Sequence, residues 1–492
     1  MVVSGDLVAT LGDWSVGAGP LYRKLADALA GAAADGVLLP GELLPAERRL
    51  AAALAVSRAT VVAAYDELRG RGVLESRQGS GTRVCAGLPA PPSDGRVRGG
   101  RGHVIFQRMI DGPGGDLISL TCAAKGGAQA VAEALDEVAR EDLPALLADP
   151  GYHPRGLPAL RAAIATHYTA GGLPTSDEEV LVTTGAHQAL VLVADLYLAP
   201  RRCVVVEAPS WPGCIDVFQA AGARLRGVPL DAEGVEPSRL ATALADEAPS
   251  LLYVMPTYHN PTGVLMSADR RRRVGELAAR HRVPVVEDNA YAGLAGTGPD
   301  GRVPAPLAVH APAGAEVLTV DSLGKSVWGG LRTGWVRAPR HIVDRLARRK
   351  ALADLGSPVL DQALAARLLP RIAELTARRS AELTERLALL ELLLRRHLPD
   401  WSWTRPAGGS ALWVRLPGGL DAGTFAQVAL RHGVEIVPGS AMDPDGGHDD
   451  HLRIPFTFEP EVLTALVRGL VGAAEELARH GPRDDRPLRP VV

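Results

Sequence analysis

The sequence predicts two folded units, a small α+β unit near the N-terminus and a large α/β unit that fills most of the remaining chain. At 492 residues the chain is too long for one hydrophobic core, and its 47% hydrophobic content can fill more than one. After residue 117, helical stretches alternate with short β-rich runs, which is typical of α/β proteins. Residues 85–116 turn to glycine and proline with scattered arginines and little apolar periodicity, so we expect a flexible linker there.

Charge and cysteine content limit the classes of function. The net charge of −3 argues against polyanion binding by the whole chain, but residues 20–84 carry nine Lys or Arg against seven acids. The four cysteines lack a Cys-x-x-Cys pair, which predicts reduced thiols rather than a disulfide framework or a metal site. They are Cys85, Cys122, Cys203 and Cys214. Since no apolar run is long enough to span a bilayer, we expect a cytoplasmic protein.

Three helices are predicted in the small unit. The first begins near Leu21 and has one apolar face, made of Leu21, Leu25, Leu29 and Ala33. The second covers residues 46–54, and the third covers residues 58–69 with Ser57 as its N-cap. Because only residues 55–57 separate the last two, the pattern predicts a helix-turn-helix.

The third helix is expected to bury one face and to present its first turn to solvent. Its apolar residues at i, i+4 and i+7 are Val61, Tyr65 and Leu68. Their spacing directs Arg58 and Thr60 outward. Two β-rich runs follow, residues 73–76 and 82–84, and a glycine-rich tip joins them. The small unit is therefore predicted to be a winged helix-turn-helix.

The start of such a third helix is the part that enters the major groove of DNA. Arg58 and Thr60 are the candidates for base contacts, and Arg48 and Ser57 are placed for phosphates. Gly79 at the tip of the wing would let the backbone approach a phosphate or the minor groove. Residues 38–48, 57–61 and 78–82 closely resemble the GntR-family winged helix. The resemblance implies double-stranded operator DNA as the partner, and the alternative is a winged helix that makes protein contacts only.

The large unit alternates helices with strands. Helices are predicted over 157–170 and 186–198. The β-rich runs are 180–182, 203–206, 251–254, 283–286 and 317–320. After about residue 339 a long helical stretch leads to strands over 411–416 and 434–437, which indicate a smaller α+β domain.

A lysine and an acid follow predicted strands at positions suited to a phosphorylated aldehyde cofactor. Lys325 is the candidate amine, and Asp288 could protonate a ring nitrogen. Tyr291 and Asn260 could hold a phenolic oxygen. These groups together predict a site for pyridoxal 5′-phosphate.

The same cofactor needs a phosphate cup and a wall for its ring. Gly185-Ala186-His187 opens a predicted helix, and its backbone N–H groups can bind phosphate. Ser322 adds a hydroxyl, and Arg332 adds a fixed positive charge. Trp211 is a candidate for the flat wall against the ring.

These motifs resemble the class I/II aminotransferases of fold type I over residues 117 to about 480. The motif residues in chain order include Tyr152, Gly185, Trp211, Asn260, Asp288, Tyr291, Lys325, Arg332 and Arg453. The resemblance implies that Lys325 forms an internal aldimine and that Arg453 binds the carboxylate of an amino acid. It also implies that Tyr152 reaches the phosphate bound by a neighbouring subunit. An obligate dimer with shared sites would follow.

Both units in this order are similar to the MocR/GabR-type branch of GntR regulators. The expected organisation is a DNA-binding unit (18–84), a linker (85–116), a cofactor-binding unit (117–480) and a tail (481–492). The linker would span roughly 30 Å, enough to place the small unit over another subunit. The resemblance implies a homodimer, arranged head to tail.

We therefore expect a transcriptional regulator that senses pyridoxal phosphate, or an amino acid or amine, through an aldimine at Lys325. One alternative is an active aminotransferase that carries a DNA-binding appendage, and another is a dimerisation scaffold with an empty pocket. Residues 120–126 depart from the substrate loop of aminotransferases, which argues for at most partial transaminase activity. The effector and the sign of regulation stay open.

Overall fold

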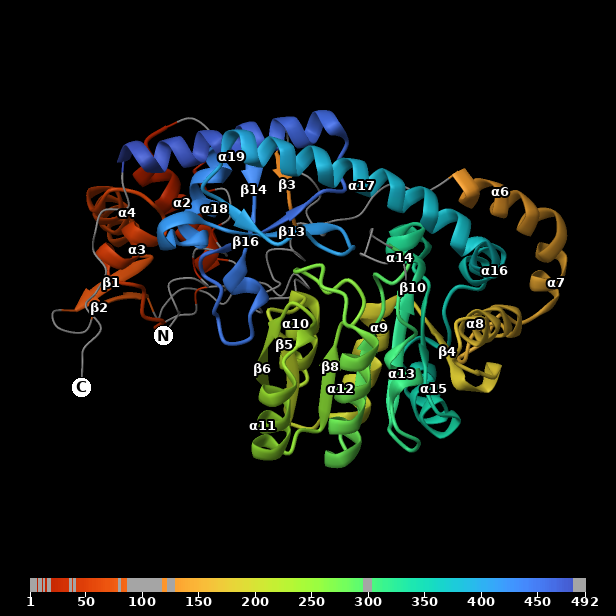
Figure 1. The fold of residues 1–492 in the computed structure, drawn as a ribbon. Helices are drawn as coiled ribbons and strands as arrows, with labels where there is room; N and C mark the ends of the chain where they lie inside the picture. Colours follow the sequence, from red (N-terminus) through yellow and green to blue (C-terminus); the bar gives the residue numbers. More distant parts are fainter. Residues whose placement is uncertain are drawn as a thin grey trace.

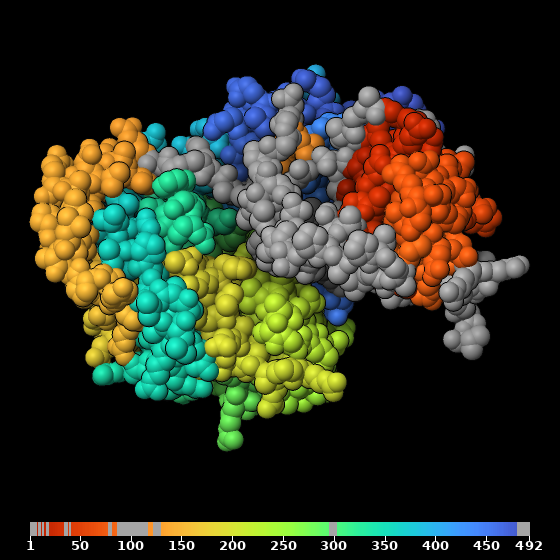
Figure 2. Space-filling view, turned by 180° about the vertical axis from the view of Figure 1, so that it is seen from behind, coloured from red at the N-terminus to blue at the C-terminus, as the bar shows by residue number. Residues whose placement is uncertain are grey.

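The computed structural model describes residues 7, 11, 14–15, 19–34, 38, 41–77, 81–85, 117–121, 129–294 and 303–480. Some predicted features lie outside these residues, namely Gly79 with the tip of the wing, most of the linker, Cys122 with the rest of the departing loop, and the tail. The small unit lies at one end of the molecule beside the C-terminal helices, and helices α6 (Gln129–Glu137) and α7 (Leu143–Ala148) lie at the other end (Figures 1 and 2).

The small unit is a winged helix-turn-helix, as predicted. Its elements are α2 (Leu21–Ala34), α3 (Glu47–Ala53), α4 (Arg58–Gly70), β1 (Leu74–Arg77) and β2 (Gly81–Val84). The two strands are antiparallel, and Val61, Tyr65 and Leu68 of α4 are fully buried. The assignment of Leu21 to the buried face is wrong, because α2 begins there, one turn before the residues that reach the core, and leaves the side chain 40% exposed.

The large unit is built on an eight-stranded sheet in the order β4-β11-β10-β9-β8-β5-β6-β7. Its strands are β4 (Val180–Thr183), β5 (Cys203–Ala208), β6 (Arg224–Asp231), β7 (Gly234–Val235), β8 (Leu251–Val254), β9 (Val285–Asp288), β10 (Val317–Ser322) and β11 (Gly334–Arg337). Strands β10, β9, β8, β5 and β6 are parallel to one another, and β11 is antiparallel to both of its neighbours. The sequence had indicated five of these strands; β6, β7 and β11 were missed.

Helices cover both faces of this sheet, which explains why β4, β8 and β9 are buried along their whole length. Alternate residues of one strand face opposite sides: Val204 and Val206 pack with α9 and α10, and Val205 packs with α11 and α12. The helices of this unit are α8 (Pro158–Ala170), α9 (Ala186–Tyr197), α10 (Pro212–Ala220), α11 (Pro237–Glu247), α12 (Ala268–His281), α13 (Leu307–His310), α14 (Leu323–Ser326), α15 (Arg340–Asp354) and α16 (Val359–Leu368).

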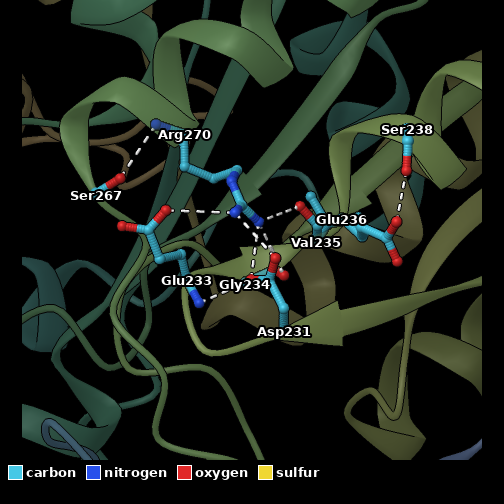
Figure 3. Close-up of polar contacts among 8 residues, drawn as sticks. All are labelled: Asp231, Glu233, Gly234, Val235, Glu236, Ser238, Ser267 and Arg270. Atoms are coloured by element: carbon cyan, nitrogen blue, oxygen red, sulfur yellow. Dashed lines mark hydrogen bonds and ion pairs between the residues drawn. The ribbon is translucent and has the colours of Figure 1, made fainter.

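An arginine ties the free edge of the sheet to a helix (Figure 3). Arg270 donates from its two terminal nitrogens to both carboxylate oxygens of Asp231, at 2.9 and 3.0 Å, and also to the carbonyl of Val235. Ser267 caps α12 by accepting from the Arg270 amide. The β6–β7 turn is thereby held against the start of α12.

A smaller C-terminal domain follows the long helix α17 (Ile372–His397) (Figure 1). Its elements are β12 (Ser402–Trp403), β13 (Ala411–Arg415), α18 (Ala422–Arg431), β14 (Val434–Glu435), β15 (Val437–Pro438), β16 (His451–Pro455) and α19 (Pro460–His480). The single strand predicted over 434–437 is wrong. It divides at Ile436, because β14 pairs with β3 (Ile118–Ser119) and β15 pairs with β16 in another sheet.

No helix in the described part of the chain is long and apolar enough to cross a membrane.

Candidate functional site

Three predicted cofactor residues meet at the carboxyl end of the parallel strands. Asp288 is the last residue of β9 and Ser322 is the last residue of β10, its direct neighbour. Lys325 lies one turn further, in α14, whose start is capped by the Ser322 hydroxyl accepting from the Gly324 amide at 3.3 Å. Ligands bind at this edge in open α/β sheets, because the loops that follow the strands leave a crevice there.

Asp288 is a buried carboxyl group fixed by two donors. Its Oδ2 accepts from the hydroxyl of Tyr253 at 2.7 Å, and its Oδ1 accepts from the amide of Ala290 at 3.0 Å. Burial raises the pKa of Asp288, and these two donors and the Lys325 ammonium oppose the rise. A carboxyl group in this position suits a protonated ring nitrogen, which would hold it in the charged form.

Tyr291 lies near both Lys325 and Arg453. The Lys325 ammonium lies 5.9 Å from the centroid of the Tyr291 ring. Burial by itself raises the pKa of Tyr291, but the charges of Lys325 and Arg453 and a hydrogen bond with Ser410 outweigh it and lower the pKa. The phenol oxygen is thus set among positive charges, where it can accept or donate a hydrogen bond.

Arg453 is buried and already paired with neutral acceptors. Its Nε donates to Asn260 Oδ1 at 3.2 Å, and a terminal nitrogen donates to the carbonyl of Leu120 at 3.3 Å. Arg453 lies in the middle of β16. Its hydrogen bond to Asn260 brings two of the predicted site residues into contact. A carboxylate would bind this guanidinium more strongly than these neutral acceptors do.

The turn before α9 has the geometry of an anion cup. Gly185 has a φ of +97°, and no described side chain caps the helix that begins at Ala186. Arg332 donates to the carbonyl of Thr184 at 2.8 Å, and a Cβ at Gly185 would lie 3.2 Å from the same nitrogen. Backbone amides at a helix start, beside a fixed guanidinium, fit a phosphate.

Trp211 contacts His187 in the first turn of α9. Their rings meet edge to face, with centroids 5.7 Å apart. Burial, followed by the charge of Arg332, lowers the pKa of His187, so the imidazole is neutral at neutral pH. Gly213 makes room for the indole of Trp211, since a Cβ there would lie 2.3 Å from it.

Tyr152 does not join the other cofactor residues within the subunit. Its side chain is 69% exposed. Beside it, Gly356 packs so closely on the backbone of His153 that a Cβ would lie 2.9 Å from the His153 carbonyl oxygen. Leu352 and Leu355, just before that glycine, are 91% and 57% exposed.

The predicted DNA-contacting residues gather at the start of α4. Arg58 is exposed and pairs with Glu47 at 3.2 Å, and Arg48 is exposed on α3. The Ser57 hydroxyl accepts from the Thr60 amide at 3.1 Å and lies 2.9 Å from the Thr60 hydroxyl. Thr60 is half-buried rather than fully outward, because its hydroxyl is drawn into this cap.

Several polar residues near the site were not found from the sequence. Tyr253 lies in the β-rich run predicted over 251–254, and its apolar neighbours give no sign of its hydrogen bond to Asp288. Glu207 and His259 form a buried pair 3.5 Å apart. Burial raises the pKa of Glu207 to about 8 and lowers the pKa of His259 to about 3. Two signals could have revealed this pair: Glu207 is an acid inside an otherwise apolar strand, and His259 directly precedes Asn260.

Comparison with known proteins agrees with this geometry. The family model for aminotransferase class I and II matches residues 126–470, and the model for bacterial regulatory proteins of the gntR family matches residues 21–84. An HTH-type transcriptional regulator of Bacillus subtilis, YisV, is 31% identical, with 94% of this chain and 96% of that protein covered. The probable rhizopine catabolism regulatory protein MocR of Rhizobium meliloti is 29% identical over 85% of this chain and 86% of its own length.

A solved structure resembles the large unit. LysN, an alpha-aminoadipate aminotransferase from Thermus thermophilus crystallised with N-(5'-phosphopyridoxyl)-L-leucine, is 31% identical with a TM-score of 0.68. The match covers 77% of this chain and 96% of LysN. The large unit is thus a pyridoxal 5′-phosphate-dependent domain of fold type I.

The whole chain belongs to the class I and II aminotransferase family, in the MocR-type branch that carries a gntR-type helix-turn-helix at its N-terminus. It is a pyridoxal phosphate-dependent, DNA-binding transcriptional regulator. When bound, pyridoxal phosphate supplies an aldehyde that reacts with amines and a ring that withdraws electrons.

Proposed function

We propose that this regulator senses an amino acid or amine at the site around Lys325 and Arg453 and transmits its binding to the DNA-binding unit. Lys325 would carry the cofactor, and Arg453 would bind the effector carboxylate. Arg48, Ser57, Arg58 and Thr60 would contact operator DNA. Since the partner is chromosomal DNA, the protein would act in the cytoplasm.

A short path of hydrogen bonds leads from Arg453 toward the DNA-binding unit, and it is the main support for this coupling. Arg453 donates to the carbonyl of Leu120, whose amide donates to the carbonyl of Glu435 at 2.8 Å. Glu435 belongs to β14, which begins three residues after the end of α18 at Arg431. A carboxylate that draws Arg453 away from Leu120 would loosen the first link of this path.

The path ends on the turn of the helix-turn-helix. Arg431 donates to the carbonyls of Leu54 and Ala55, both at 3.1 Å, and pairs with Glu476 at 2.8 Å. Ala55 also packs against the hydrophobic core of the large unit. Because Ser57 and Arg58 follow directly, a shift of α18 would move the residues that face DNA.

We also propose that the protein acts as a homodimer. Leu352, Leu355 and Tyr152 are exposed apolar residues, and the backbone contact between Gly356 and His153 joins the chain segments that carry them. A gathering of exposed apolar residues is typical of a surface that binds another protein. A second copy is the occupant that would let Tyr152 reach a neighbouring phosphate, with the two chains arranged head to tail through their large units. Two units on one dimer also offset the weak DNA affinity of a single one.

The coupling is tested with the full chain, loaded with pyridoxal phosphate, and a fluorescent duplex taken from immediately upstream of its own coding region. Without substitutions, one member of an amino acid panel should change the dissociation constant for DNA several-fold. Arg431→Ala should abolish that change while cofactor binding stays normal. Arg468→Ala, on the neighbouring helix α19, serves as the control.

Two results would contradict the proposal. An Arg431→Ala protein that keeps the full amino acid response would remove the coupling path. Sustained turnover of an amino acid with a keto acid acceptor, with DNA affinity unaffected, would favour a working aminotransferase instead.

A further inference from the structure

Tyr253 lies in the second layer of the cofactor site, behind Asp288. It occupies the middle of β8, is fully buried, and is paired with Val286 of β9 in the sheet register. Residues 286 and 288 of β9 point to the same face, so Tyr253 lies diagonally across from Asp288 on that face. The phenol is long enough to span this offset, and its hydroxyl donates to Asp288 Oδ2 at 2.7 Å.

The Tyr253 ring is held in place by its neighbours, which makes the hydrogen bond directional. Phe218 meets it edge to face, with centroids 5.7 Å apart. The Ala290 amide holds the other carboxylate oxygen of Asp288. With one donor on each oxygen, the plane of the carboxylate is fixed before any ligand arrives.

The charged surroundings of Asp288 make this donor important. The Lys325 ammonium is the positive charge that acts on Asp288. Burial and, to a smaller extent, the Asp288 carboxylate in turn act to raise the pKa values of its neighbours Glu207, Cys214, Tyr291 and Asp321. Burial raises the pKa of Glu207 to about 8, so this neighbour is mostly uncharged at neutral pH. Two hydrogen-bond donors favour the charged form of Asp288, the amide of Ala290 and the hydroxyl of Tyr253.

We propose that Tyr253 is a positioning residue that orients Asp288 and keeps it anionic toward the ring nitrogen of pyridoxal phosphate. The inference rests on the proposed role of Asp288 at that nitrogen. Tyr253 does not touch the cofactor in this scheme; it acts through the carboxylate. Removal of its hydroxyl leaves a buried carboxylate oxygen without this donor, which disfavours the charged form.

The test compares Tyr253→Phe with Tyr168→Phe in the full-length protein. Tyr168 is a matched control because it is also a buried tyrosine of the large unit, and its hydroxyl accepts from Trp335 Nε1 at 2.9 Å, away from Asp288. We expect Tyr253→Phe to weaken pyridoxal phosphate binding about tenfold in equilibrium dialysis, since it removes a hydrogen bond to a charged group. It should also shift the visible absorption band of the bound cofactor, and Tyr168→Phe should change neither.

Equal effects of the two substitutions, or unchanged affinity and spectrum in Tyr253→Phe, would overturn the inference. Circular dichroism and thermal midpoints identify a variant that fails to fold, and Tyr253→Trp with its indole N–H donor then provides a second test by partial rescue. Asp288→Asn distinguishes the role of Asp288 from the role of Tyr253. If Asp288→Asn binds the cofactor like the unmodified protein, the role of Asp288 fails; if it loses binding and Tyr253→Phe does not, only the role of Tyr253 fails.

Discussion

The DNA-binding unit and the cofactor-binding unit place their charges in opposite ways. In the small unit the described core is apolar apart from Tyr65, whose hydroxyl donates to the carbonyl of Pro45 at 2.9 Å. Its ion pairs, such as Arg58 with Glu47, lie at the surface. The large unit instead buries Asp288 and Arg453 together with other charged groups.

Because of this difference, we expect substitutions at the predicted site of the small unit to change function alone, and substitutions at the cofactor site of the large unit to change function and stability together. Surface ion pairs add little to stability, so the predicted DNA-contacting residues of the small unit can change without cost to its core. A buried charge that loses its partner is destabilising by several kcal/mol, so the cofactor site of the large unit affects both ligand affinity and folding.

The largest expected effect is that of Asp288→Ala. It leaves the Tyr253 hydroxyl without its acceptor and removes the negative charge that faces the Lys325 ammonium. Loss of one partner of a buried charged pair corresponds to about 100- to 1000-fold weaker cofactor binding. Equilibrium dialysis with pyridoxal phosphate measures it. DNA affinity of the cofactor-free protein should not change, and a parallel loss of DNA binding would contradict the separation of the two units.

The next effect is on the pH dependence of stability in Glu207→Gln. The pKa of Glu207 is raised from 4.5 to about 8, so between these pH values the folded chain holds a proton that the unfolded chain has lost. The stability contributed by the neutral carboxyl is present below pH 4.5 and falls as pH rises toward 8, by at most about 1.4 kcal/mol per pH unit. Glutamine has no proton to lose.

Thermal unfolding between pH 5 and 8 measures this difference. The slope of the midpoint against pH should flatten in Glu207→Gln, whereas Glu461→Gln on the exposed start of α19 should keep the slope of the unmodified protein. Identical slopes in all three proteins would mean that Glu207 is ionised in the folded state.

The smallest effect on folding is expected from Arg58→Ala. Its exposed ion pair with Glu47 contributes less than about 0.5 kcal/mol to stability, but loss of a base contact should weaken DNA binding about tenfold. Fluorescence anisotropy measures the affinity. Arg69→Ala, at the other end of the same helix, is the control, and an equal loss in both variants would point to a general charge effect.

Local patterns allowed much of the fold to be predicted. The spacing of Val61, Tyr65 and Leu68 set the buried face of α4, and Ser57 capped it as expected. The predicted strand over 434–437 failed, because the choice between two sheets depends on partners that lie far away in the chain. The apolar neighbours of Tyr253 in its strand gave no sign that its hydroxyl donates to Asp288.

By itself, the sequence determined the two-unit organisation, the third helix of the winged helix-turn-helix, and the positions of Lys325, Asp288 and Arg453 along the chain, because periodicity, capping and motif spacing are local properties. Only the tertiary structure decided which groups hold these residues. Arg453 meets Leu120 across 333 positions, and Arg431 meets Leu54 across 377. Such contacts arise from how the sheets and helices pack, and no local pattern records them.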